Sequence, residues 1–228
     1  CEHSIVMNKK KGSENMDKKE LQNPALYTNR ELSWLLFNKR VLSEARDKQL
    51  LLFERLKFLS ITASNLDEFF MVRIGSLVDM IHAEYTKKDI AGMSAKEQLD
   101  ALMEETHKFA ALQYSTYNRM LLPQLRANGL NFVEHHEQLT ERQAQYVDEY
   151  FEENVYPVLT PMAVDSSRPF PLIRNKTLNI GALVAKKGEK DTEIEFATVQ
   201  VPSVLPRVVR IPAAKEGDTE VAVLLLEE

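Results

Sequence analysis

Apolar residues recur at helical intervals through the first half of the chain, and β-branched runs replace them after Gly129. Trp34, Phe37, Val41 and Ala45, for example, lie three or four residues apart. This spacing gives each helix one apolar face to bury, and short links between such helices favour antiparallel packing. The sequence therefore predicts an antiparallel helical bundle followed by a region of a different kind.

Polar residues indicate where the first and last helices of this bundle begin. Thr28-x-x-Glu31 and Ser94-x-x-Glu97 have the spacing of a capping box, in which a hydroxyl and a carboxylate bind free backbone N–H groups. The last helix is expected to continue to about Arg126, because the apolar spacing holds that far.

Two further helices are expected between them. One covers residues 51–62, and Ser64 or Asn65 then caps the next, because either side chain can accept a hydrogen bond from the first turn. Asp67 and Glu68 would lie in that first turn, where carboxylates interact favourably with the positive end of the helix dipole. The bundle is therefore predicted to hold four helices.

The second half of the chain is expected to combine one helix with several strands. The helix begins at Thr140-x-x-Gln143, which again has capping-box spacing. Runs of β-branched and apolar residues separated by polar turns predict strands. These runs cover residues 130–133, 177–185, 193–201, 204–211 and 221–226. The predicted fold class is α+β, with the strands in an antiparallel sheet.

The composition limits the classes of function and location. The net charge of −5 argues against a general nucleic-acid binder, whose surface is usually basic. No apolar run approaches the roughly 18 residues that a membrane-spanning helix needs. The single cysteine, Cys1, cannot form an intramolecular disulfide, which fits a reducing cytoplasm. We therefore predict a cytoplasmic protein with no nucleic-acid partner and no transmembrane segment, and leave peripheral association with the inner membrane open.

Two long motifs are specific enough to suggest a family. Residues 29–45 read NRELSWLLFNKRVLSEA, and residues 56–74 read LKFLSITASNLDEFFMVRI. Both resemble the N-terminal domain of bacterial polyphosphate kinases, a family that moves phosphate between ATP and inorganic polyphosphate. Residues 161–184 and 204–212 resemble the head, or middle, domain of the same family and stand in the expected order.

The resemblance implies a domain organisation of three parts. Residues 1–22 are expected to be a disordered extension, because they are polar and rich in lysine. Residues 23–128 would form the helical N-terminal domain, and residues 129–228 part of the head domain. The chain begins with Cys1 and stops directly after the apolar run 221–226. We therefore expect an incomplete head domain in which that run lacks a sheet neighbour.

The resemblance implies one site residue in this chain, Asn65, as a contact of bound ATP. An amide side chain can donate to and accept from an adenine edge, and the expected helix N-terminus would offer free N–H groups to an anion. A plain helix cap without a ligand is the alternative interpretation. Trp34 is expected in the core rather than as a platform for a base. Arg73 is expected either to form an ion pair or to face an adjoining domain.

The resemblance also implies the reaction, which is reversible transfer of the terminal phosphate of ATP to polyphosphate. The phosphohistidine intermediate and the Mg²⁺ ligands are expected downstream of Glu228, so no catalytic residue and no metal ligand is assigned within this chain. ATP or ADP and polyphosphate are the implied substrates, and the head domain is the implied contact of a homo-oligomer. The chain alone is expected to be inactive. The alternative is a non-catalytic module from a truncated gene, which binds nucleotide or polyphosphate or only dimerises.

A loose set of basic residues surrounds the proline-rich loop and the third predicted strand of the second half. Guanidinium groups pair well with phosphate oxygens, so this set is a candidate wall for the polyphosphate chain. A solvated surface with ordinary ion pairs is the alternative interpretation. The residues are Arg168, Arg174, Lys176, Arg207 and Arg210.

Overall fold

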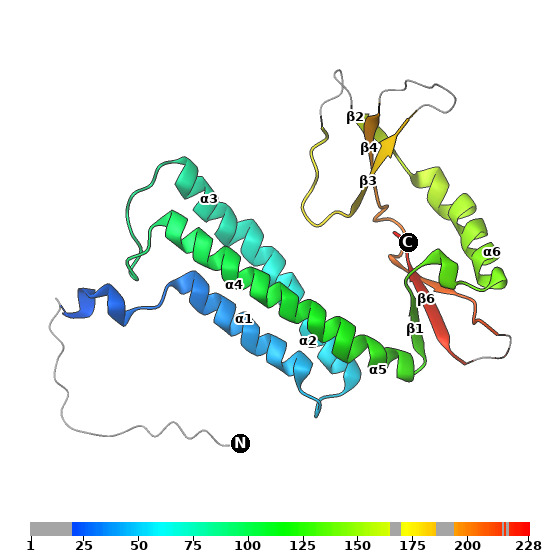
Figure 1. Ribbon diagram of the computed structural model, residues 1–228, viewed down its shortest axis with the longest axis horizontal. Helices are drawn as coiled ribbons and strands as arrows, with labels where there is room; N and C mark the ends of the chain where they lie inside the picture. Colours follow the sequence, from blue (N-terminus) through cyan, green and yellow to red (C-terminus); the bar gives the residue numbers. More distant parts are fainter. Residues whose placement is uncertain (1–19, 165–169, 186–193, 216, 218) are drawn as a thin grey trace. The chain divides into compact units, whose positions relative to one another are not determined.

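The computed structural model describes residues 20–164, 170–185, 194–215, 217 and 219–228, and it divides into two compact units (Figure 1). The first unit ends at Thr116 and the second begins at Tyr117. The extension predicted over residues 1–22 lies outside the described part, except for a short 3-10 turn at Glu20–Gln22. The domain limits predicted from the sequence are not decided by these units and stay predictions.

In the described residues of the first unit, two 3-10 turns at Glu20–Gln22 and Pro24–Leu26 precede a bundle of three longer helical segments. The first segment is α1 (Arg30–Arg46), the second joins α2 (Leu52–Phe69), the π-helix η3 (Phe70–Ile74) and α3 (Gly75–His82), and the third is α4 (Ala95–Thr116). Figure 1 shows that the second segment runs against the other two. The predicted antiparallel helical bundle is therefore confirmed.

The helix break predicted near residues 62–64 is wrong, because α2 runs through it without interruption. The prediction took Ser64 or Asn65 for a cap, since short polar side chains often bind nearby backbone N–H groups at helix starts. The Asn65 side chain instead donates to another helix, with 3.0 Å between its Nδ2 and Oδ1 of Asn38. It therefore does not compete with the helix backbone.

The first helix begins one residue later than Thr28 would allow as its cap. Asn29 is the N-cap of α1, and its Oδ1 accepts from the backbone N–H groups of Glu31 and Leu32 at 3.0 and 2.9 Å. Its Nδ2 donates to Asp89 at 2.7 Å, in the link between α3 and α4. One asparagine therefore caps α1 and ties its start to that link.

Two other predicted capping boxes are confirmed. Oε2 of Glu97 accepts from the backbone N–H of Ser94 at 2.8 Å, and this hydrogen bond lowers the pKa of the Glu97 carboxyl. Thr140 and Gln143 form the reciprocal pair of bonds at the start of α6 (Glu141–Tyr150). Gln143 also donates to the carbonyl of Pro212 at 2.8 Å, which fixes α6 to the segment after β5.

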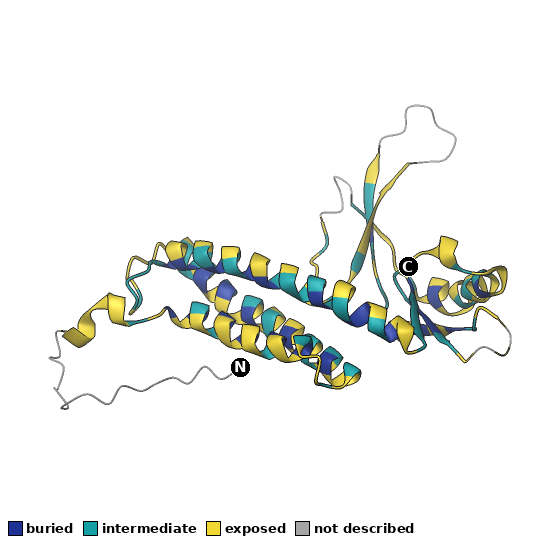
Figure 2. Ribbon diagram, turned by 60° about the horizontal axis from the view of Figure 1, so that its bottom comes forward, coloured by how far each residue is buried: buried dark blue, intermediate teal, exposed yellow. Residues whose placement is uncertain are grey.

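The core of the first unit lies between the three segments, where Figure 2 shows buried residues along their facing sides. Leu42 and Leu102 are fully buried. The core also holds buried polar side chains, and such groups need hydrogen-bond partners. The apolar members of the core clusters are Leu35, Leu42, Ala45, Phe69, Ile74, Leu77, Ala95, Leu102 and Phe109. The polar residues buried in this unit are Asn29, Glu31, Asn38, Arg55, Thr62, Gln98, Thr106 and Thr116.

Helical backbone continues into the second unit, as predicted. The π-helix η4 (Tyr117–Leu121) leads directly into α5 (Leu122–Ala127), and Pro123 lies in the first turn of α5. Proline has no backbone N–H, so it cannot form the hydrogen bond to the preceding turn that a regular helix would have there. The π-helical turn just before Pro123 accommodates the missing bond. After β1 (Leu130–Val133), α6 is followed by the π-helix η6 (Phe151–Val155).

The second unit holds two three-stranded sheets, β1-β6-β5 and β2-β4-β3. β6 pairs with β1 in parallel and with β5 antiparallel, whereas β2, β4 and β3 are antiparallel throughout. The strands after β1 are β2 (Met162–Val164), β3 (Asn179–Val184), β4 (Glu195–Gln200), β5 (Val208–Ile211) and β6 (Val221–Leu225). The α+β fold class is confirmed, while the single antiparallel sheet is replaced by two sheets, one of them mixed.

The expectation that the last strand lacks a neighbour is wrong. β6 is the central strand of its sheet, with β1 on one side and β5 on the other. Three of its residues are buried, and α6 covers the sheet through Val147 and Tyr150. The Arg207 guanidinium holds the strand's end, because it binds the carboxylate of Glu227 and thereby lowers the pKa of that carboxyl.

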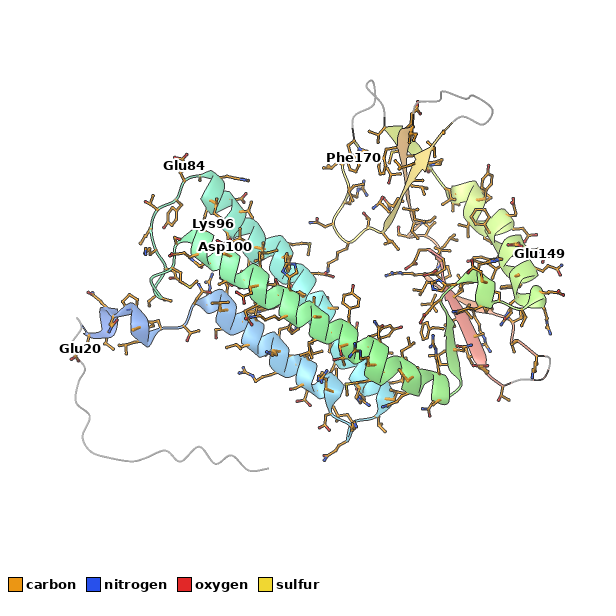
Figure 3. All side chains as sticks on the ribbon, viewed as in Figure 1. Glu20, Glu84, Lys96, Asp100, Glu149 and Phe170 are labelled. Atoms are coloured by element: carbon orange, nitrogen blue, oxygen red, sulfur yellow. The ribbon has the colours of Figure 1, made fainter. Side chains whose placement is uncertain are left out.

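The second sheet is much more exposed. Leu183 of β3 is 76% exposed. Phe170, labelled in Figure 3, stacks on Phe196 of β4 with 5.9 Å between ring centroids. A Cβ on Gly181 would lie 3.0 Å from the Phe196 ring, which explains a glycine at that point of β3. Across both units, no helix among the described residues combines the length and apolar character needed to cross a membrane.

Candidate functional site

A surface pocket of about 220 Å³ lies on the first unit beside Asn65. Its wall is built by one face of α1 and by the end of α2 with the following π-helix. We call it the Asn65 pocket. The residues that line it are Trp34, Phe37, Asn65, Glu68, Phe69, Val72 and Arg73.

Aromatic rings form much of the Asn65 pocket. Trp34 of α1 stacks on Phe69 of α2 with 4.5 Å between centroids and 11° between planes. Phe69 is buried and belongs to the core, and Trp34 is partly buried against the same cluster. The prediction of Trp34 as a core residue therefore holds, and the same side chain also borders the pocket. Phe37, predicted on the buried face of α1, is instead 47% exposed.

Asn65 lies inside α2 rather than at a helix start, so the predicted N-cap role is wrong. Asn65 therefore has no free backbone N–H groups or positive helix end to offer an anion, because those features belong to the first turn of a helix. Asp67 and Glu68 are likewise near the end of α2, not in a first turn. What remains for Asn65 is its side-chain amide, which is half-buried and borders the pocket.

The buried side chain of Asn38 holds the amide of Asn65 by a hydrogen bond. Asn38 is fully buried, and its Oδ1 accepts from Nδ2 of Asn65 at 3.0 Å. Its own Nδ2 donates to the backbone carbonyl of Thr62 at 3.1 Å. Sequence reasoning missed Asn38, although one signal was present: Leu35, Asn38 and Leu42 share the spacing of a buried helix face.

Two charged side chains, Glu68 and Arg73, line the pocket. Arg73 forms an ion pair with Glu31, with 3.8 Å between its Nε and Oε2 of Glu31. This was one of the two roles predicted for Arg73. Glu31 is buried, and Arg30 binds its other oxygen at 2.7 Å. The Arg73 side chain is 45% exposed and lines the pocket. A partly exposed cation beside an aromatic pocket suits an anionic ligand that carries a planar ring.

No histidine of the described part is among the residues that line this pocket. His107 is exposed and its Nδ1 is 2.7 Å from the carbonyl of Met103. His135 and His136 face carboxylates of the second unit at 4.0 and 3.7 Å. Within the described ranges, no group of three His, Cys, Asp or Glu side chains is arranged to hold a metal ion.

The predicted basic wall is only partly described. Arg168 lies outside the described residues. Arg207 is engaged by Glu227, with 3.0 Å between Nε and Oε1, whereas Arg174 and Arg210 are exposed. Lys176 has a left-handed backbone with φ of 60°. A contact of this set with polyphosphate stays a prediction.

Two family models match the chain along most of its length. The polyphosphate kinase N-terminal domain matches residues 27–133, and the polyphosphate kinase middle domain matches residues 142–228. Every residue that lines the Asn65 pocket falls in the first of these ranges.

Individual relatives agree with the family models. A polyphosphate kinase of Lactiplantibacillus plantarum is 53% identical over 188 residues, which are 82% of this chain and 26% of that protein. One of Halalkalibacterium halodurans is 47% identical over 194 residues, or 85% and 27%. The crystal structure of polyphosphate kinase from Porphyromonas gingivalis superposes with a TM-score of 0.74 at 30% identity and covers 88% of this chain and 28% of its own.

The chain thus spans about a quarter of the length of the curated relatives that it matches. The two domain models follow one another in the chain without overlap, and the solved structure extends across both. On this combined evidence the chain belongs to the polyphosphate kinase family, in which it matches the N-terminal and middle domains.

Proposed function

We propose that this chain is the N-terminal part of a polyphosphate kinase that reversibly transfers the terminal phosphate of ATP to inorganic polyphosphate. Its role there is to contact the nucleotide through the Asn65 pocket. The phosphohistidine and the ligands of Mg²⁺ belong, in this proposal, to the part of the relatives that the chain does not cover. The second unit contributes to a homo-oligomer, and the enzyme acts in the cytoplasm.

One observation carries the proposal: an asparagine amide borders a pocket built from aromatic rings. A purine base has a flat π-face and a hydrogen-bonding edge, and stacking on an aromatic side chain contributes about 1–3 kcal/mol per base. The hydrogen bond to Asn38 uses one N–H of Asn65 and leaves its carbonyl oxygen and second N–H to other partners. Arg73 lines the same pocket and supplies a positive charge that can pair with a phosphate group.

Replacing the amide tests the nucleotide contact. Asn65→Ala should weaken ATP binding by roughly 0.5 to 1.5 kcal/mol, about two- to tenfold in Kd, because one hydrogen bond to the base is lost. Trp34 is the only tryptophan and lines the pocket, so its fluorescence reports binding there directly. The variant should also melt at a lower temperature, because Asn38 loses its buried partner.

Ser64→Ala is the matched control, since Ser64 precedes Asn65 on the same helix and is exposed. Its ATP affinity should equal that of the unchanged chain. A Kd that Asn65→Ala leaves unaltered, or Trp34 fluorescence that does not respond to ATP at all, would rule out the proposed contact.

The chain of 228 residues alone should make no polyphosphate from ATP and Mg²⁺. In the proposal, the histidine that carries the phosphate lies in sequence that the relatives have and this chain does not match. Incubation with ATP labelled on its terminal phosphate, followed by gel separation of polymer, measures the outcome. The complete enzyme of Lactiplantibacillus plantarum provides the positive control. Labelled polymer from a homogeneous sample of the chain would contradict this part of the proposal.

A further inference from the structure

The backbone carbonyl of Thr62 fixes the orientation of the Asn65 amide indirectly, through the side chain of Asn38. The carbonyl oxygen of Thr62 can only accept, so the group of Asn38 that faces it at 3.1 Å must be the N–H₂ group. The carbonyl oxygen of Asn38 then points the other way, toward Asn65. It can only accept as well, so Asn65 must present its own N–H₂ group at 3.0 Å.

This order leaves Asn65 no freedom to exchange its oxygen and nitrogen. A flipped Asn65 would place two carbonyl oxygens against each other, with Asn38 held in a site that is fully buried. Polar groups at such a site are costly to leave unmatched, because the surroundings do not screen them. The Asn38–Asn65 amide pair therefore has one arrangement. The Thr62 carbonyl of α2 orients Asn38 of α1, and Asn38 in turn orients Asn65 of α2.

A fixed amide can discriminate between bases. An adenine edge presents an amino donor next to a ring-nitrogen acceptor, and an asparagine with a free carbonyl oxygen and N–H matches that pair. A 6-oxopurine presents a carbonyl oxygen in place of the amino group. That oxygen would meet the carbonyl oxygen of Asn65, which cannot rotate away. Discrimination of this kind needs a rigid partner, since a freely turning amide would accept either base.

We propose that Asn38 is a positioning residue that makes the Asn65 pocket select adenine over 6-oxopurine nucleotides. It does not line the pocket, and it acts only by holding the amide of Asn65. This inference rests on the proposed nucleotide contact of Asn65. A merely structural Asn38 would affect the stability of the bundle and leave the choice of base unchanged.

The test compares ATP with inosine triphosphate, which differs from it in the 6-amino group and the adjoining ring nitrogen. Dissociation constants are measured by Trp34 fluorescence on the full chain. The unchanged chain should bind ATP about tenfold tighter, because both contacts of the Asn65 amide match an adenine edge and neither matches a 6-oxopurine edge. Asn38→Leu removes the acceptor for Asn65 at similar volume, so the two constants should fall within about twofold of each other.

Gln113→Leu is the matched control. Gln113 of α4 donates to the hydroxyl of Thr62 at 3.0 Å, not to its carbonyl, so this change removes a polar group from the same region but leaves the amide pair intact. It should lower the melting temperature and keep the tenfold preference. Circular dichroism establishes that each variant retains its helices.

The outcomes separate the two proposals. Absence of ATP binding by the unchanged chain would overturn the nucleotide contact itself. Binding of ATP with the same preference in Asn38→Leu would overturn only the positioning role. Should Asn38→Leu fail to fold, Asn38→Ala decides instead, because it also removes the acceptor for Asn65 and places no oxygen opposite the Thr62 carbonyl. Dissociation constants for the two nucleotides within about twofold of each other support the role, and an unchanged tenfold preference refutes it.

Discussion

Phe69→Ala is expected to cost the first unit about 3–5 kcal/mol of unfolding free energy and to abolish nucleotide binding at the Asn65 pocket. Phe69 is only 2% exposed and belongs to the largest core cluster, so truncation leaves a cavity between α1 and α2. It also removes the ring on which Trp34 stacks. Urea unfolding followed by Trp34 fluorescence measures the stability of this unit, because the only tryptophan lies within it.

Phe37 supplies the matched control, as a second phenylalanine that lines the same pocket. It is 47% exposed, so Phe37→Ala removes little buried surface and should cost about 1 kcal/mol or less. Equal losses of unfolding free energy in Phe69→Ala and Phe37→Ala would contradict the placement of Phe69 in the core and of Phe37 at the surface.

The second large effect is expected in the central strand of the mixed sheet. Leu224→Asp should destabilise the second unit by roughly 3–5 kcal/mol, because it places a carboxylate among apolar side chains without a partner. Leu224 is 6% exposed and lies in the cluster that α6 covers. Hydrogen exchange of the β6 amides reports the loss locally, and these amides should change from slow to fast exchange.

The same substitution on another strand separates burial from charge. Leu183 of β3 is 76% exposed, so Leu183→Asp should change the stability by no more than about 0.5 kcal/mol. Slow exchange of β6 that survives Leu224→Asp would mean that this strand is not the buried centre of its sheet.

The helix starts could be predicted where the signal is local. The Ser94–Glu97 and Thr140–Gln143 boxes involve side chains and N–H groups within one turn, and both are formed. Ser64-Asn65 carries the same kind of signal, yet α2 continues through it. The deciding contact there is with α1, and no rule about neighbouring residues contains that information.

The site could be predicted only in part. The resemblance singles out Asn65, and the structure places it beside a pocket. Asn38 was missed because Phe37 is the more apolar neighbour and was assigned to the buried face. The helix is rotated so that Leu35, Asn38 and Leu42 face inward. The cost of burying Asn38 is offset by its hydrogen bonds to Thr62 and Asn65 of α2. The periodicity of α1 alone does not reveal these contacts.

The parallel pairing of β1 with β6 was equally invisible to local patterns. Parallel strands need a crossover between them, and here almost the whole second unit lies between the two partners. Hairpin-like turns therefore pointed to antiparallel neighbours, which is correct for β5 with β6 and for β3 with β4. Pairings between distant runs depend on which faces remain to be buried once the helices have packed.

This parallel pair has a consequence for synthesis on the ribosome. β1 ends at Val133, and the strand that pairs with it among the described residues begins at Val221. The first unit ends at Thr116, so it can fold while later residues are still being translated. At ordinary elongation rates of about 5–20 residues per second, β1 has left the peptidyl-transferase centre on the order of ten seconds before β6 exists. The nascent chain therefore carries a finished helical bundle and an unpaired strand for most of the time in which its second unit is made.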